Sequence, residues 1–161
     1  MAKVLIIEAR FYDHIADGLL AGARAEFDKA GVDHDLLVVP GIFELPATLK
    51  LVLTAAEQGN DKARYDGFVT LGCAIRGESD HYHHVGTECM RGIADLSMAY
   101  DLALGNGVLT VHNEAQALAR SDPARKNLGG QAARACLRMM AVKKELGLGP
   151  IPIQRNHREK K

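Results

Sequence analysis

The segment from Gly72 to Val85 carries the side chains of this chain that are best suited to chemistry. An apolar run ends there in Arg76, a glycine turn, Ser79 and then His81. Imidazole exchanges a proton near pH ~6.5, so His81 is the candidate acid and base. Amides and a hydroxyl that precede a helix can also hold an anion, and Glu78 lies beside them. A structural histidine and a turn without a ligand stay open as alternatives from this segment alone.

Two loops after earlier apolar runs hold an aromatic ring and a carboxylate. Phe11 follows the first run, in a chain whose aromatic content is only 5%. Its ring can stack on a flat ligand or can cap the core. Glu44 follows the second run, between Pro40 and Pro46, where a helix is expected to start. Its carboxylate can accept hydrogen bonds from a ligand or can interact with the helix dipole.

Arg120 and two further histidines complete the candidate groups. A short helix is expected after Val108–Val111, and Arg120 lies one turn into it. There it can reach a phosphate of its own subunit or of a neighbour, with a plain surface arginine as the alternative. His83 and His84 follow His81, but helix neighbours one and two residues apart do not share a face. We therefore expect no metal site.

Four apolar runs, rich in β-branched residues or leucine, are the elements expected to position these groups. Continuous runs of this length are typical of strands that are buried on both faces of a parallel sheet. The predicted strands are Val4–Ile7, Leu36–Val39, Phe68–Leu71 continuing to Ile75, and Val108–Val111.

Helical patterns alternate with these runs. The alternation predicts an α/β fold, a flavodoxin-like three-layer α/β/α sandwich with a four-stranded parallel sheet. Ligands of such folds bind at the carboxyl ends of the strands, and so small a sheet favours oligomerisation. The predicted helices span Ile15 to Phe27, Leu45 to Glu57, the region from near His81 to Tyr100, and Gln131 to Leu146.

Composition limits the class of protein. The 161 residues are 47% apolar, which suits one domain over 1–161 with the basic segment 150–161 as a solvated tail. Lys+Arg and Asp+Glu balance at 20 each, which argues against nucleic-acid binding. The chain lacks an apolar run of the ~18 residues that a membrane span needs, and lacks a signal-peptide pattern, so a cytoplasmic protein is expected. The three cysteines lie among apolar residues and are expected to be reduced core thiols.

Four ordered motifs, which span nearly the whole chain, resemble the 6,7-dimethyl-8-ribityllumazine synthase family. They are Arg10-Phe11, the segments 40–46 and 72–85, and Thr110-x-x-Asn113-x-x-Gln116-Ala117. The resemblance implies a single lumazine synthase domain that needs no metal and no cofactor. It implies condensation of 5-amino-6-(D-ribitylamino)uracil with 3,4-dihydroxy-2-butanone 4-phosphate to the lumazine, with release of phosphate, as the penultimate step of riboflavin biosynthesis.

The resemblance also implies roles for the site residues. His81 would be the acid and base, and Phe11 would stack on the pyrimidine. Arg120 of an adjacent subunit would join Glu78 and Ser79 in binding the phosphate, because the family assembles as a pentamer, in some members as twelve pentamers in a shell. The pyrimidine and ribityl chain would be held by Ile42, Phe43, Glu44 and the backbone of Cys73, Ala74 and Ile75.

The chain departs from the family pattern at three places. Asn106 stands where many members place an aromatic residue that covers the pyrimidine from the neighbouring subunit. Ala124 and Leu128 stand where lysines are common. An insertion at 58–62, a changed loop near Asn127 and the lack of an N-terminal extension favour a free pentamer over a shell.

Rival functions share the predicted fold. An archaeal-type riboflavin synthase dismutates two lumazines, and the segment 76–81 fits it less well. A non-catalytic paralogue that binds lumazine or flavin is disfavoured because Glu44, His81 and Arg120 are all retained. A receiver or nucleotide-binding module needs an acidic pair or Gly-x-Gly-x-x-Gly after the first strand, and the sequence at 8–11 supplies neither.

Overall fold

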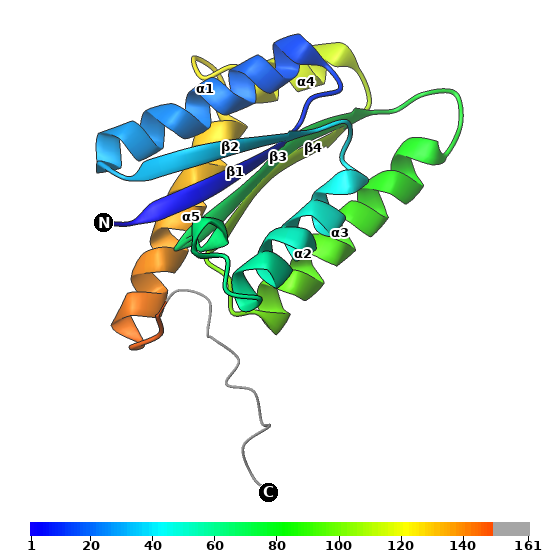
Figure 1. The fold of residues 1–161 in the computed structure, drawn as a ribbon. Helices are drawn as coiled ribbons and strands as arrows, with labels where there is room; N and C mark the ends of the chain where they lie inside the picture. The colour runs from blue at the N-terminus through cyan, green and yellow to red at the C-terminus, as the bar shows by residue number, and fades with distance from the viewer. Residues whose placement is uncertain (150–161) are drawn as a thin grey trace, which may run out of the picture.

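A central four-stranded parallel sheet in the order β2-β1-β3-β4 organises the chain (Figure 1). The computed structural model describes residues 1–149, and the basic tail predicted at 150–161 lies outside them. Helices cover both faces, which confirms the predicted three-layer α/β/α sandwich. The elements are β1 (Lys3–Ala9), α1 (Asp13–Ala30), β2 (Asp33–Val39), α2 (Glu44–Glu57), the short 3-10 turn η1 (Asp61–Ala63), β3 (Gly67–Ile75), α3 (His81–Ala99), β4 (Leu104–Val111), α4 (Glu114–Ser121) and α5 (Leu128–Glu145).

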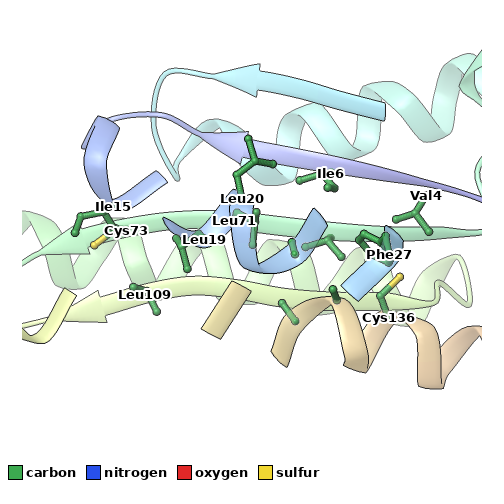
Figure 2. Packing of buried hydrophobic residues seen from close by; sticks show 14 of the residues in the cluster. Val4, Ile6, Ile15, Leu19, Leu20, Phe27, Leu71, Cys73, Leu109 and Cys136 are labelled. Carbon is green, nitrogen blue, oxygen red and sulfur yellow. The ribbon is translucent and has the colours of Figure 1, made fainter. Parts of the chain in front are cut away.

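Two hydrophobic clusters, one on each face of the sheet, hold the layers together. On one face, α1, α4 and α5 pack on the strands, and Leu19, Phe27 and Cys136 are fully buried there (Figure 2). On the other face, α2 and α3 pack through residues such as Leu49 and Ile93. Burial of each large apolar side chain stabilises the fold by about 1.5 to 3 kcal/mol. The sheet is therefore a rigid platform for the loops that follow its strands.

The structure corrects one expectation about β2. Its apolar run was predicted to be buried on both faces, but β2 is an edge strand, and Leu36 and Val38 are exposed, Val38 to 52%. The central strand β3 does have continuous burial over its first seven residues, Gly67 to Cys73. A continuous apolar run has the same pattern in a central strand and in an edge strand, so the sequence alone does not show which position the strand takes in the sheet.

Two glycines allow α5 to approach its neighbours closely. A Cβ atom placed on Gly105 of β4 would lie 1.8 Å from the carbonyl oxygen of Ala132 in α5. A Cβ atom on Gly129 of α5 would lie 2.0 Å from the carbonyl oxygen of Leu19 in α1. In both cases the contact is with backbone, which cannot turn aside as a side chain can.

The three cysteines are free and buried, as predicted. Burial raises the pKa of the Cys73 and Cys136 thiols to about 12 and that of Cys89 to about 11. They are protonated core residues at neutral pH. Among the described helices, none combines the length and the apolar content needed to cross a membrane.

Candidate active site

The four loops that follow the strands lie at the same end of the sheet, at the carboxyl ends of the strands, because all four strands are parallel (Figure 1). Ala9 pairs with Val39 across β1 and β2, and Ile75 pairs with Val111 across β3 and β4. The carboxyl ends are therefore level within each of these two pairs, and β3 continues beyond the end of β1, since Glu8 pairs with Leu71. The loops bring together most of the residues predicted from sequence, at the place where open α/β sheets bind ligands.

Phe11 is exposed in the loop between β1 and α1. Its residue is 70% accessible, which excludes the alternative that the ring caps the core. The ring meets the half-buried Tyr12 edge-on, with ring centroids 5.0 Å apart. One face of a flat, apolar ring is thus available for stacking on a ligand.

The loop between β2 and α2 divides its three predicted site residues. Phe43 and Glu44 are exposed, and Glu44 is the first residue of α2, so its carboxylate is also placed well for the helix dipole. Ile42 is only 5% exposed and packs over Gly72 of β3. Its side chain belongs to the core, so a ligand would meet this residue through its backbone.

Gly72 is expected to be required for this loop. A Cβ atom there would lie 2.7 Å from Cγ2 of Ile42 and 3.1 Å from Cβ of Ala9. Gly72→Ala should lower the free energy of unfolding by about 1 to 3 kcal/mol, because the added methyl overpacks a filled site. Urea unfolding measures the loss. In a double-mutant cycle, Ile42→Ala should cost less in the Gly72→Ala chain than in the native one, and equal costs would contradict the clash.

The end of β3 offers backbone more than side chains. Cys73 is buried with a raised pKa, so it is not a nucleophile at neutral pH. Ala74 and Ile75 are half-buried, and both pair with β4. The backbone amide of Arg76 donates to the carbonyl of Val111 and so closes the ladder.

The turn between β3 and α3 is exposed and opens at a helix N-terminus. Glu78, Ser79 and His81 are all exposed, and α3 begins at His81. The Ser79 hydroxyl accepts a hydrogen bond from the backbone amide of His81 at 3.4 Å. The Asp80 side chain makes no cap bond. Residues with a hydroxyl and an imidazole therefore lie at the positive end of a helix dipole, and this is a favourable environment for an anion that must exchange protons.

Arg120 lies in the last turn of α4 and is half-buried. Its Nη1 atom donates to the carbonyl of Gln116 at 3.3 Å, and none of the ion pairs within residues 1–149 includes it. The Asn113 side chain caps α4 by accepting from the amide of Gln116 at 2.9 Å. α4, which carries Arg120, lies on the face of the sheet that α1 covers, and α3, which follows the Ser79 turn, lies on the opposite face (Figure 1).

Asn106 lies in the first half of β4, away from the strand ends. It faces Thr70, whose hydroxyl donates to Oδ1 at 3.0 Å, and its Nδ2 atom lies 2.9 Å from the sulfur of Met90. Within one chain the amide is used by the protein itself. A surface groove of about 340 Å³ lies nearby and is lined by Tyr82, His83, Gly86, Thr87, Met90 and Thr110.

Sequence reasoning missed Glu8. Its carboxylate is completely buried at the end of β1, and Oε1 lies 2.5 Å from Nε of Arg10. A charged residue inside an apolar strand, followed two residues later by an arginine, was the available signal. Within residues 1–149, no group of three or more histidine, cysteine, aspartate or glutamate side chains is arranged to hold a metal ion.

Comparison with known proteins identifies a family whose sequence model matches the chain. Residues 1–144 match the sequence model described as 6,7-dimethyl-8-ribityllumazine synthase. The chain is similar to the 6,7-dimethyl-8-ribityllumazine synthase of Paramagnetospirillum magneticum, with 98% identity over 148 residues that cover 92% of this chain and 99% of the relative. Identity to the Sphingopyxis alaskensis enzyme of the same name is 50%, covering 92% and 100%. Identity to that of Afipia carboxidovorans is 48%, covering 90% and 88%.

Proposed function

Since the chain belongs to the 6,7-dimethyl-8-ribityllumazine synthase family, we propose that it catalyses the penultimate step of riboflavin biosynthesis as a single-domain enzyme. The reaction condenses 5-amino-6-(D-ribitylamino)uracil with 3,4-dihydroxy-2-butanone 4-phosphate. The 5-amino group forms an imine with loss of water, phosphate is eliminated, and the ribitylamino nitrogen closes the ring with loss of a second water. Each step transfers protons, and imine formation needs the two substrates to be held in the correct mutual orientation.

The observation that best supports this proposal is the turn at the end of β3. It places the exposed His81 two residues after Ser79, at the N-terminus of α3, with the backbone amide of His81 bonded to the Ser79 hydroxyl. We assign proton transfer to His81 and phosphate binding to Glu78 and Ser79. A phosphate at this place benefits from the helix dipole, and the imidazole can protonate it as it leaves.

The pyrimidine is assigned to the neighbouring loops. The exposed ring of Phe11 gives it a stacking surface, and the exposed Phe43 and Glu44 lie on the next loop of the same edge. The backbone of Ile42 and of residues 73–75 completes the pocket for the ring and the ribityl chain. The carboxylate of Glu44 can accept hydrogen bonds from ribityl hydroxyls.

We extend the proposal to a pentamer whose active sites combine two subunits. Arg120 lies on α4, on the face of the sheet opposite α3, and Asn106 lies in the first half of β4, so we assign both to a site shared with a neighbour. Exposed apolar side chains on the edge strand β2 and on α3, among them Leu36, Val38 and Met98, give a second chain a surface to cover. A free pentamer is favoured, so native mass spectrometry should give five chains per particle, and sixty would refute it.

The cytoplasm is the proposed location. All three thiols are free in the fold, and unpaired cysteines suit a reducing compartment. Fractionation of cells that produce the chain with its own termini would place it directly.

The test of the activity is direct. Purified protein mixed with both substrates should form a lumazine, followed by its absorbance, and omission of either substrate should abolish the signal. A wild-type chain that folds and forms no product would overturn the proposal. Conversion of two lumazines to riboflavin would instead favour the riboflavin synthase alternative.

Arg120→Ala is expected to weaken binding of the phosphorylated butanone selectively. One charge-assisted phosphate contact contributes about 1.5 to 3 kcal/mol, so KM for that substrate should rise about ten- to hundredfold. KM for the pyrimidine should change little. Arg138→Ala is a matched control, because Arg138 is an exposed arginine whose ion pair within residues 1–149 is with Glu145 of its own helix. Equal effects on both substrates would count against the assignment.

A further inference from the structure

A buried ion pair holds the turn that carries Phe11. The Glu8 side chain is fully buried, and within the described residues Arg10 is its charged partner, with Nε 2.5 Å from Oε1. Neither carboxylate oxygen has a hydrogen bond of good geometry. A buried carboxylate is stable only beside a counter-charge, so Glu8 fixes where the Arg10 guanidinium must lie.

The other end of the Arg10 guanidinium is attached to α1. Its Nη1 atom lies 2.7 Å from the Asp17 carboxylate, and 3.3 Å from both the carboxylate and the carbonyl oxygen of Asp13. The hydrogen bond to Asp17, then the ion pair with Glu8 and the hydrogen bond to Asp13, raise the pKa of Arg10 above its ordinary value. The backbone amide of Arg10 donates to Val39 of β2 at 2.9 Å. One residue thus ties together β1, β2 and the first turns of α1.

Phe11 has little else to hold it. It lies between Arg10 and Tyr12, the N-cap residue of α1, whose side chain makes no cap bond. The ring is 70% exposed and touches one aromatic neighbour by an edge. Its direction therefore depends on the backbone of the two flanking residues, and Arg10 fixes one of them.

We propose that Glu8 and Arg10 are positioning residues, whose ion pair and bridges to Asp13 and Asp17 preset the Phe11 ring to receive a flat heterocycle. That the heterocycle is the pyrimidine rests on the proposed function. A ring that is already held in place loses no conformational freedom when the ligand binds. Disruption of this clamp, that is, of the Glu8–Arg10 ion pair and its bridges to Asp13 and Asp17, should therefore weaken the binding of the heterocycle alone.

The same contacts argue against Arg10 as a second phosphate ligand. Its Nε and Nη1 atoms already face three carboxylates, so the local cluster holds one positive and three negative charges. Arg120, by contrast, faces no carboxylate within residues 1–149. A phosphate is attracted by the second arrangement and repelled by the first.

The chain contains no tryptophan, so Phe11→Trp introduces a single fluorescent reporter at the ring in question. In this background, Arg10→Lys should lower the indole anisotropy and raise its quenching by acrylamide about twofold, because a lysine cannot bridge three carboxylates at once. Asp17→Asn should change both indole signals in the same direction. Glu8→Gln alters a fully buried side chain, whereas Asp17 is 70% exposed, so Asp17→Asn tests the clamp even where Glu8→Gln fails to fold.

Arg134→Lys is the matched control. Arg134 also ties a residue to α1, with Nη1 2.7 Å from Glu26, but at the far end of the helix. It should lower thermal stability without changing the indole signal. Equal indole mobility in the Phe11→Trp chain alone and in the same chain with Arg10→Lys or with Asp17→Asn would overturn the proposal.

The activity arm uses the native Phe11. Arg10→Lys should raise KM for the pyrimidine about tenfold and leave kcat and KM for the butanone phosphate within about twofold. A rise confined to KM for the butanone phosphate would make Arg10 a phosphate ligand and overturn the positioning role. The fluorescence arm needs no substrate, so a chain that makes no lumazine refutes the proposed function and leaves the clamp to be decided by the indole alone.

Discussion

His81→Ala is expected to lower kcat about 100-fold, with KM for either substrate changed by less than about threefold. His81 is the first residue of α3 and is exposed, so the loss of its side chain removes the proposed proton carrier without leaving a cavity. Imine formation, phosphate loss and ring closure each require protons to be moved. Steady-state kinetics of the folded variant with both substrates measures the effect.

His84→Ala is the matched control for this prediction. His84 is exposed on the same helix, and its backbone amide donates to the Asp80 carbonyl, which a substitution to alanine retains. The activity of His84→Ala should stay within about twofold of wild type, because proton transfer is assigned to His81 and not to His84. Equal losses at the two positions would show that the helix N-terminus, and not the His81 imidazole, was disturbed.

Gly105→Ala is expected to have the largest effect on stability. The new Cβ atom would lie 1.8 Å from the carbonyl oxygen of Ala132, 2.7 Å from its carbonyl carbon and 3.1 Å from the amide nitrogen of Cys136. All three atoms are backbone of α5, so the whole helix must move away from β4. We expect a loss of about 3 kcal/mol or more in the free energy of unfolding, measured by urea titration.

Gly77→Ala controls for the intrinsic effect of replacing glycine. A Cβ atom there meets nothing within 4 Å, so unfolding free energy should change by less than about 1 kcal/mol. If Gly105→Ala unfolded at the same urea concentration as Gly77→Ala, the close approach of α5 to β4 would be wrong.

The fold was largely predictable because its strands are apolar runs and its helices have apolar faces. The run Phe68–Ile75 identified the central strand β3. Helix starts were less accurate: α5 begins at Leu128 and not at Gln131, because Asn127 caps it by accepting a hydrogen bond at Oδ1 from the amide of Gly130. Gly129 is required there by its close packing on Leu19 of α1, and a Cβ atom on Gly130 would lie 2.3 Å from Nδ2 of Asn127.

The exposed position of candidate residues was predictable where polar residues follow an apolar run, as Ser79 and His81 do. Packing was not predictable where two distant residues decide it. Ile42 was assigned to the ligand, and the missing side chain at Gly72 lets the Ile42 side chain pack into the core, which leaves its backbone for that task. Glu8 stands in a strand whose pattern does not reveal that Arg10 folds back to pair with it.

The buried thiols have a practical consequence for labelling. The raised pKa values of Cys73, Cys89 and Cys136 leave almost no thiolate at neutral pH, and the thiolate is the form that alkylating reagents attack. The native chain thus provides an unreactive background without any cysteine having to be removed. A cysteine introduced at an exposed position in one of the loops that follow the strands would accept a dye or spin label at that position alone. The spectrum of the label would then report how each substrate changes the mobility of that loop.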